Sequence, residues 1–318
     1  MSLTVVEYLA GVSLGDGAGG LGPMLSVLQS ADQEYNVELN SVIPVGMTHP
    51  VYASVIGRNI AVPMQCGQID DLLTAIGNMG ANVSTTELFY RSIDNVGGPN
   101  PIDITATDVG AALHSVFRAG KVIAYFNQLS AGDRKQAFAN IQLMCVKDGA
   151  NEAMVLVGTT EHITRNPVGD DSYFSLGPIV YPGGKVLEGC DDFQLPFTPA
   201  AKELSSESNK DTEHASVRNI DPEITFTCTD RTAWNLRNTS AAGMKFHLVR
   251  GKNESDCYLP TEAQHIRLTI PKGLFVVEGK DSGDESRYSC KVKPVGDIAD
   301  GWNGQVLNWA VNVPIDLT

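Results

Sequence analysis

Two glycine patterns near the N-terminus have the spacing of chemical motifs. Gly11-Val-Ser13-Leu-Gly15 matches the G-x-S-x-G nucleophile elbow, in which a strand-to-helix turn exposes a reactive serine oxygen. Gly15-Asp-Gly17-Ala-Gly-Gly20 matches the G-x-G-x-x-G loop that holds a pyrophosphate at a helix N-terminus. Neither context fits, because flexible glycine-rich sequence follows the serine and strand patterns follow the loop. We therefore expect no catalytic residue and no cofactor.

Residues that bind metals are not grouped along the chain. The six histidines are scattered, with no H-x-x-x-H pair and no paired cysteines beside them. Acidic pairs occur at Asp70-Asp71, Asp170-Asp171 and Asp191-Asp192, but adjacent side chains on a strand point to opposite faces. We interpret these acids as solvated charges and helix-start residues, and we predict no metal site.

The six cysteines are also far apart, and no two of them form a C-x-x-C pair. Most occur in apolar or alternating stretches, where a thiol packs as a small hydrophobic group. We predict reduced, buried thiols, since disulfides would require export from a reducing compartment. The cysteines are Cys66, Cys145, Cys190, Cys228, Cys257 and Cys290.

The elements around these residues are mostly strands. Runs of β-branched and aromatic residues alternate with Gly, Pro and Asn clusters, and the 31 glycines and 16 prolines favour turns over long helices. The pattern predicts antiparallel β architecture. The expected strands are 38–43, 51–55, 88–93, 121–126, 141–146, 153–157, 173–180, 224–228, 244–249, 265–270, 274–278, 287–293 and 306–313.

Two helices are expected in the first half of the chain. Ile69, Leu72, Leu73 and Ile76 recur at the i, i+3, i+4, i+7 spacing of an amphipathic helix. A second apolar pattern of helical period extends from Val109 to Phe117. Thr107 or Asp108 can cap this second helix at its start, and Gly120 can end it.

Length, charge and hydropathy limit the class of protein. A chain of 318 residues suits two domains of about 150 residues each. The net charge of −14 repels phosphate, which argues against tight nucleic-acid binding. We see no signal peptide, and no apolar run reaches the ~20 residues of a membrane-spanning helix. We therefore expect a soluble protein that does not insert into membranes.

An internal repeat is the most informative feature of the sequence. Residues 101–108 parallel 222–230, each a predicted strand that ends in Thr-Asp, and Ala119-Gly120-Lys121 parallels Ala242-Gly243-Met244. Residues 140–143 then parallel 265–268. The repeat predicts two tandem β-sandwich or barrel domains, 1–165 and 166–318, each flanked by a short α-helix. The turn cluster 165–171 is the expected boundary.

The polar segment 199–214 has no apolar period. We expect an exposed loop or hairpin tip, which either orders on contact with a partner or is solvated and has no function. Together with the glycine-rich segment, it is the expected site of assembly contacts. The residues assigned to these contacts are Gly15, Gly17, Gly20, Glu203, Lys210 and His214.

The C-terminal copy resembles the tail tube proteins of long-tailed bacteriophages. The resemblance rests on Pro222-Glu-Ile-Thr-Phe-Thr-Cys-Thr-Asp230, which leads to a short helix at 232–238, and on Ile266-Arg-Leu-Thr-Ile-Pro-Lys-Gly273. From there, Asp281-Ser-Gly-Asp-Glu285 leads to Tyr288-Ser-Cys-Lys-Val-Lys-Pro294, in the manner of the closing hairpin of that family. The match covers the last third of the chain directly, and the first copy only through the repeat.

This resemblance implies a structural protein and not an enzyme. Two copies per chain would form homotrimeric rings with pseudo-sixfold symmetry, stacked into a tube that carries DNA and contacts other tail proteins. An acidic lumen would let DNA pass without sticking, and the protein, made in the host cytoplasm, would belong to the virion tail. Alternatives are another tail-tip or decoration protein, or a β-sandwich carbohydrate-binding or adhesion module.

Overall fold

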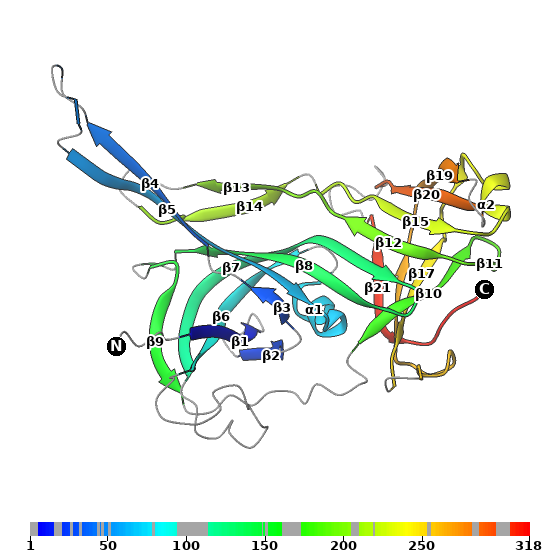
Figure 1. Ribbon diagram of the computed structural model, residues 1–318, viewed down its shortest axis with the longest axis horizontal. Helices are drawn as coiled ribbons and strands as arrows, with labels where there is room; N and C mark the ends of the chain where they lie inside the picture. Colours follow the sequence, from blue (N-terminus) through cyan, green and yellow to red (C-terminus); the bar gives the residue numbers. More distant parts are fainter. Residues whose placement is uncertain are drawn as a thin grey trace.

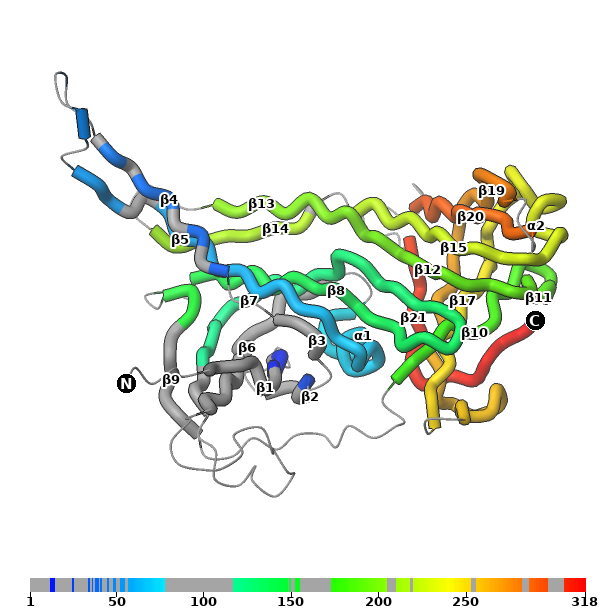
Figure 2. The backbone as a smooth tube through the Cα atoms, in the orientation of Figure 1, coloured from blue at the N-terminus to red at the C-terminus, as the bar shows by residue number. Residues whose placement is uncertain are grey.

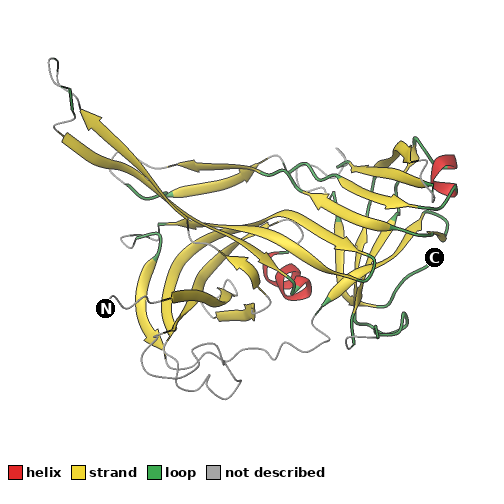
Figure 3. Ribbon diagram, viewed as in Figure 1, coloured by secondary structure: helices red, strands yellow, loops and turns green. Residues whose placement is uncertain are grey.

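The computed structural model describes most of the chain. The residues described are 6–15, 21–25, 28–31, 34–42, 45, 48–49, 52–77, 80–93, 114–147, 149, 152–160, 173–204, 210–218, 220–252, 256–281, 286–296 and 306–318. Within them the fold is mainly β, with two short helices (Figure 3). Every pair of named strands is antiparallel, which confirms the predicted mainly β, antiparallel class.

The largest sheet has 14 strands in the described part of the chain and extends over both halves of the sequence (Figure 1). Its main path runs β16-β19-β20-β15-β12-β7-β6-β1-β2, and β3, β4, β5, β8 and β9 branch from this path. The strands are β1 (Val6–Gly15), β2 (Leu21–Leu25), β3 (Leu28–Ala31), β4 (Glu34–Val42), β5 (Tyr52–Cys66), β6 (Gly80–Ile93), β7 (His114–Gly132), β8 (Lys135–Val146), β9 (Val155–Thr160), β12 (Asp191–Pro196), β15 (Ile224–Cys228), β16 (Thr239–Ser240), β19 (Gly273–Asp281) and β20 (Arg287–Pro294).

Two smaller sheets complete the fold. A five-stranded sheet has the order β11-β10-β17-β18-β21, and a separate hairpin consists of β13 and β14. Their bounds are β10 (Phe174–Tyr181), β11 (Lys185–Leu187), β13 (Ala200–Leu204), β14 (His214–Arg218), β17 (Lys245–Arg250), β18 (His265–Thr269) and β21 (Asn308–Val313). The helices are α1 (Ile69–Ile76) and α2 (Thr232–Asn235).

Strand β7 joins the two halves of the chain. Along one edge, its residues 114–125 pair with β6 and its residues 128–131 pair with β12. Along the other edge it pairs first with β9 and then with β8. A strand of 19 residues can therefore hold the N-terminal strands and the first strand of the C-terminal half of the sheet in one hydrogen-bonded network.

The C-terminal half is a sandwich of two sheets. Strands β12 and β15 face the five-stranded sheet, where the ring of Phe246 lies 5.5 Å from that of Phe193 and 5.7 Å from that of Phe226. Side chains along β15 alternate between the two faces of the sheet, which explains this packing. Ile224, Phe226 and Cys228 are buried, and the residues between them are less buried. Aromatic pairs at these separations stabilise the fold by more than their buried area alone accounts for.

Helix α1 packs where the two halves meet. Ile69, Leu72, Leu73 and Ile76, the residues of the predicted apolar stripe, are all buried, and the helix bounds match the prediction. Helix α1 contacts β2, β6 and β8 of the large sheet and also β21 of the five-stranded sheet. On its polar side, Asp70 forms an ion pair of 3.3 Å with Arg250 of β17.

The second predicted helix, from Val109 to Phe117, is wrong in its described part. Residues 114–120 belong to β7, where Phe117 pairs with Leu88 of β6 and with Leu156 of β9. Hydrogen bonding to a neighbour on each side outweighs a local helical pattern, and valine and phenylalanine both suit a strand. Residues 109–113 lie outside the described part.

The repeat agrees with the structure only in part. Residues 140–143 and 265–268 lie in strands β8 and β18, and α2 follows β15 as expected. Gly120, however, lies inside β7, whereas Gly243 lies in a turn with φ of 84° before β17. The boundary at 165–171 falls outside the described residues, so the division into domains 1–165 and 166–318 remains a prediction.

Candidate assembly surfaces

A two-stranded arm projects from the body of the protein (Figure 2). Its strands are β4 and the outer part of β5, paired from Glu34 with Ala61 to Val42 with Tyr52. The inner part of β5, from Ile60 onwards, pairs with β8, whereas β4 is the only partner of residues 52–59 among the named strands. The arm thus extends beyond the sheet that anchors it.

The arm carries large apolar side chains that are exposed. Leu39 is 66% exposed, Tyr52 is 61% exposed, and Val45, in the connection between the strands, is fully exposed. A two-stranded ribbon is marginally stable in water by itself, and exposed apolar groups on it favour contact with another surface. The arm therefore has the properties of a contact element.

An ion pair fixes the base of the arm to a distant part of the chain. The Arg58 guanidinium donates from Nε to Oδ1 of Asp211 at 2.8 Å and from a terminal nitrogen to Oδ2 at 2.9 Å. Glu152 accepts a further hydrogen bond of 3.2 Å. The hydrogen bond that Arg58 donates to Asp211 raises the pKa of Arg58 above its usual value, so the guanidinium stays charged.

Backbone hydrogen bonds strengthen the same junction. The Arg58 N–H donates to the carbonyl of Lys210 at 2.5 Å, and the Lys147 N–H donates to that of Thr212 at 2.8 Å. Residues 210–212 precede β14, so the β13–β14 hairpin lies against the root of the arm. Two-point charge-assisted bonds with a buried carboxylate hold the junction in one geometry.

The expected assembly residues fall into separate groups. Glu203, Lys210 and His214 all belong to the β13–β14 hairpin, which confirms a hairpin in the described part of 199–214. Lys210 and His214 are exposed, and Glu203 is half-buried and accepts a bond of 3.4 Å from Thr212. This group lies beside the arm, and its role in assembly remains a prediction.

Gly15 is not part of that group. It ends β1 and pairs with Leu21 of β2, and β6 separates β1 from β7 in the sheet. Gly17 and Gly20 lie outside the described residues.

The arm was not predicted from the sequence. The sequence does contain two strand patterns of similar length on either side of Pro44 and Pro50, which is the pattern of a two-stranded ribbon. This pattern does not predict how far the two strands extend beyond the core.

Ser13 and the acidic pairs, which were considered for catalysis or metal binding, have surroundings that fit a role in the fold. Ser13 is 1% exposed inside β1, between buried Val12 and Leu14, so it is not on a strand-to-helix turn. Asp191 accepts a backbone hydrogen bond of 2.8 Å from Asp133. Burial raises the pKa of Asp71, and like charge on Asp70 adds to this. In the described part, no group of His, Cys, Asp and Glu is arranged to hold a metal.

Buried thiols approach one another in the sandwich. The Sγ atoms of Cys228 and Cys290 lie 3.6 Å apart, and all six cysteines have free thiols. Cys66, Cys145, Cys228 and Cys290 are buried, which confirms the prediction for most of the six. The hydrogen bond to Cys228 and burial raise the pKa of Cys290, so this thiol is held in its neutral form.

Comparisons with known proteins provide no family assignment. No protein-family model matches the chain, and no curated protein matches it. Neither helix in the described part is long and apolar enough to span a membrane.

Proposed function

We propose that this protein is a structural, non-enzymatic subunit that assembles with copies of itself into the stacked rings of a viral tail tube. The single observation that carries the proposal is the β4–β5 arm, with Leu39 and Tyr52 exposed beyond the core. An arm that projects from one subunit can reach a neighbour, and burial of its apolar groups would favour association by about 25 cal/mol per Å².

The architecture and the charge agree with this proposal. The 14-stranded sheet joins both halves of the chain and would give each subunit one continuous β-surface for a tube wall. A net charge of −14 suits the wall of a conduit for DNA, because phosphates are repelled from it. The homotrimeric ring, the contacts with other tail proteins and the location in the virion rest on the resemblance of the C-terminal copy.

The test is assembly of the purified protein as its concentration rises, followed by light scattering and negative-stain electron microscopy. We expect rings or tubes with threefold or pseudo-sixfold end views. The double variant Leu39→Asp/Tyr52→Asp should remain monomeric, because it places charge on the arm. Leu259→Asp is the matched control, since Leu259 is 64% exposed but lies outside the arm, in the connection between β17 and β18.

Two results would contradict the proposal. A wild-type protein that stays monomeric at all concentrations would argue against a tube, as would an arm variant that assembles like the wild type. Specific binding of a glycan by a wild-type monomer would instead favour the carbohydrate-binding module.

A further inference from the structure

A second exposed surface lies around α2 and the β19–β20 hairpin. Trp234 of α2 is 42% exposed, and its ring lies 6.4 Å from that of Tyr288 in β20. The Arg237 guanidinium lies 4.6 Å from the centre of the Trp234 ring, and the Lys280 ammonium lies 5.9 Å from that of Tyr288. We call these four residues the cation–aromatic patch.

The two cations of the patch have no carboxylate partner among the described residues. Arg237 donates a hydrogen bond of 2.9 Å to the carbonyl of Trp234, and Lys280 is placed over a ring. Asp230, next to α2, accepts a hydrogen bond of 2.7 Å from the backbone of Thr232. Exposed cations stacked on aromatic rings remain able to meet an incoming carboxylate.

The composition of the patch is that of a protein-binding surface. Trp, Tyr and Arg are the residue types most enriched among those that dominate interface energies. Tyr288 is nearly buried, so it supports the patch from beneath, whereas Trp234 presents apolar area to an incoming surface. The chain has 37 acidic and 23 basic residues, and the two cations of the patch give it the sign of charge that is less common in this protein.

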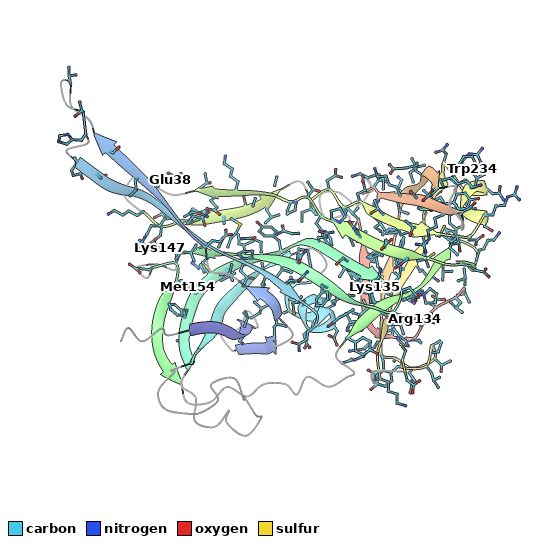
Figure 4. The ribbon with its side chains drawn as sticks, viewed as in Figure 1. Glu38, Arg134, Lys135, Lys147, Met154 and Trp234 are labelled. Carbon is cyan, nitrogen blue, oxygen red and sulfur yellow. The ribbon has the colours of Figure 1, made fainter. Side chains whose placement is uncertain are left out.

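The arm carries acidic and apolar side chains that complement the cation–aromatic patch. Glu34 and Glu38 are exposed on β4 and form no ion pair within the described part. Exposed Leu39 follows Glu38 at a shift in the register between β4 and β5. Figure 4 places Glu38 and Trp234 near opposite ends of the long axis of the protein. Complementary surfaces at opposite ends of one chain pair head to tail between copies and cannot pair within one copy.

We infer that the cation–aromatic patch receives the β4–β5 arm of a second copy of this chain. Glu34 and Glu38 then approach Arg237 and Lys280, and Leu39 packs against Trp234. This inference rests on the proposed function, since it names the receiving surface for the proposed arm.

Charge reversal tests the pairing directly. The arm-reversed variant carries Glu34→Lys and Glu38→Lys, and the patch-reversed variant carries Arg237→Glu and Lys280→Glu. Each variant alone should need at least about tenfold more protein to assemble, because like charges then face each other across the contact. A single chain that carries all four substitutions should assemble at wild-type concentrations, since each arm then meets a patch of opposite sign.

Controls separate the contact from general effects of charge. Lys252→Glu changes an exposed lysine in another loop and should assemble like the wild type. Trp234→Ala should weaken assembly, because it removes the apolar area that the patch presents to a partner, and its midpoint of thermal unfolding should fall only slightly, because 42% of the residue is exposed. Circular dichroism of every variant confirms that each one is folded.

Failure of this inference can be distinguished from failure of the proposed function. Wild-type assembly together with normal assembly of the patch-reversed variant would overturn the patch and leave the tube proposal in place. Failure of the chain with all four substitutions to assemble would also overturn it. A wild-type monomer that never assembles would overturn both.

Discussion

Arg58 and Asp211 are separated by 153 positions in the sequence, yet they form a two-point ion pair at the root of the arm. The two side chains differ in environment, because that of Asp211 is 8% exposed and that of Arg58 is 35% exposed. Removal of either partner therefore has a different consequence for the one that remains.

Arg58→Met should destabilise the protein by about 1 to 3 kcal/mol, since it leaves a buried carboxylate without its partner. Asp211→Ala should cost less, because the exposed guanidinium retains Glu152 and water. Urea unfolding measures both. The control is Lys293→Met, which breaks an exposed pair with Asp221 and should cost less than about 1 kcal/mol. Equal losses for all three variants would contradict this interpretation.

His247 makes stability depend on pH. Its Nδ1 donates to the carbonyl of Pro178 at 2.8 Å, and its Nε2 accepts from the backbone N–H of Asp316 at 3.2 Å, which requires a neutral ring. Burial lowers the pKa of His247, the positive charges of Arg267 and Lys245 add to this, and Pro178 and Asp316 oppose it.

A lowered folded-state pKa means that the unfolded chain binds the proton first as pH falls. Stability should therefore decrease as pH falls below about 6.5, with a slope of up to about 1.4 kcal/mol per pH unit from this group. His247→Gln should flatten the change in unfolding free energy between pH 7.5 and pH 5.5. His214→Gln, on an exposed site, is the control and should retain the wild-type slope. A wild-type slope in His247→Gln would argue against this assignment.

Thiol reactivity should separate Cys257 from the other cysteines. Cys257 is exposed, whereas burial raises the pKa of Cys66 and Cys145 to about 12. A thiolate reagent should label about one group rapidly in the folded protein and the full set after unfolding. Cys257→Ser should lose the rapid phase. A lower total after unfolding without reductant would reveal a disulfide and contradict the free thiols.

Two glycines with similar backbone angles should respond differently to alanine. Gly189 and Gly243 have φ of 61° and 84°, so both substitutions introduce strain of about 1 kcal/mol. A Cβ at Gly189 would also lie 2.0 Å from Oγ1 of Thr229, whereas one at Gly243 meets nothing within 4 Å. Gly189→Ala should therefore cost about 1 to 3 kcal/mol more in thermal or urea unfolding. Equal costs would show that Thr229 moves aside freely.

Local patterns predicted most elements because each pattern repeats with the period of its own backbone. The predicted strand 224–228 matches β15 in both bounds, and the predicted helix at 69–76 matches α1. The predicted helix at 109–117 was wrong for its described residues, which lie in β7. The strands that pair with β7 are far away in the sequence and satisfy its backbone hydrogen bonds on both edges.

The candidate site was predicted less completely. Segment 199–214 was expected to be an exposed loop or hairpin tip, and its described part belongs to the hairpin of β13 and β14. The arm, the Arg58–Asp211 pair and the cation–aromatic patch were not predicted, since each depends on residues brought together from separate strands or on how far strands pass beyond the core.

By itself, the sequence determined the antiparallel β class, the amphipathic stripe of α1 and the apolar settings of most cysteines. These follow from side-chain periodicity and hydropathy, which act within a few residues. Only the tertiary structure decided that β7 joins β6 and β12 in one sheet, that Asp211 anchors the base of the arm, and that Glu38 and Trp234 lie at opposite ends. Those outcomes depend on strand order and register, which are set by packing between residues that are distant in the chain.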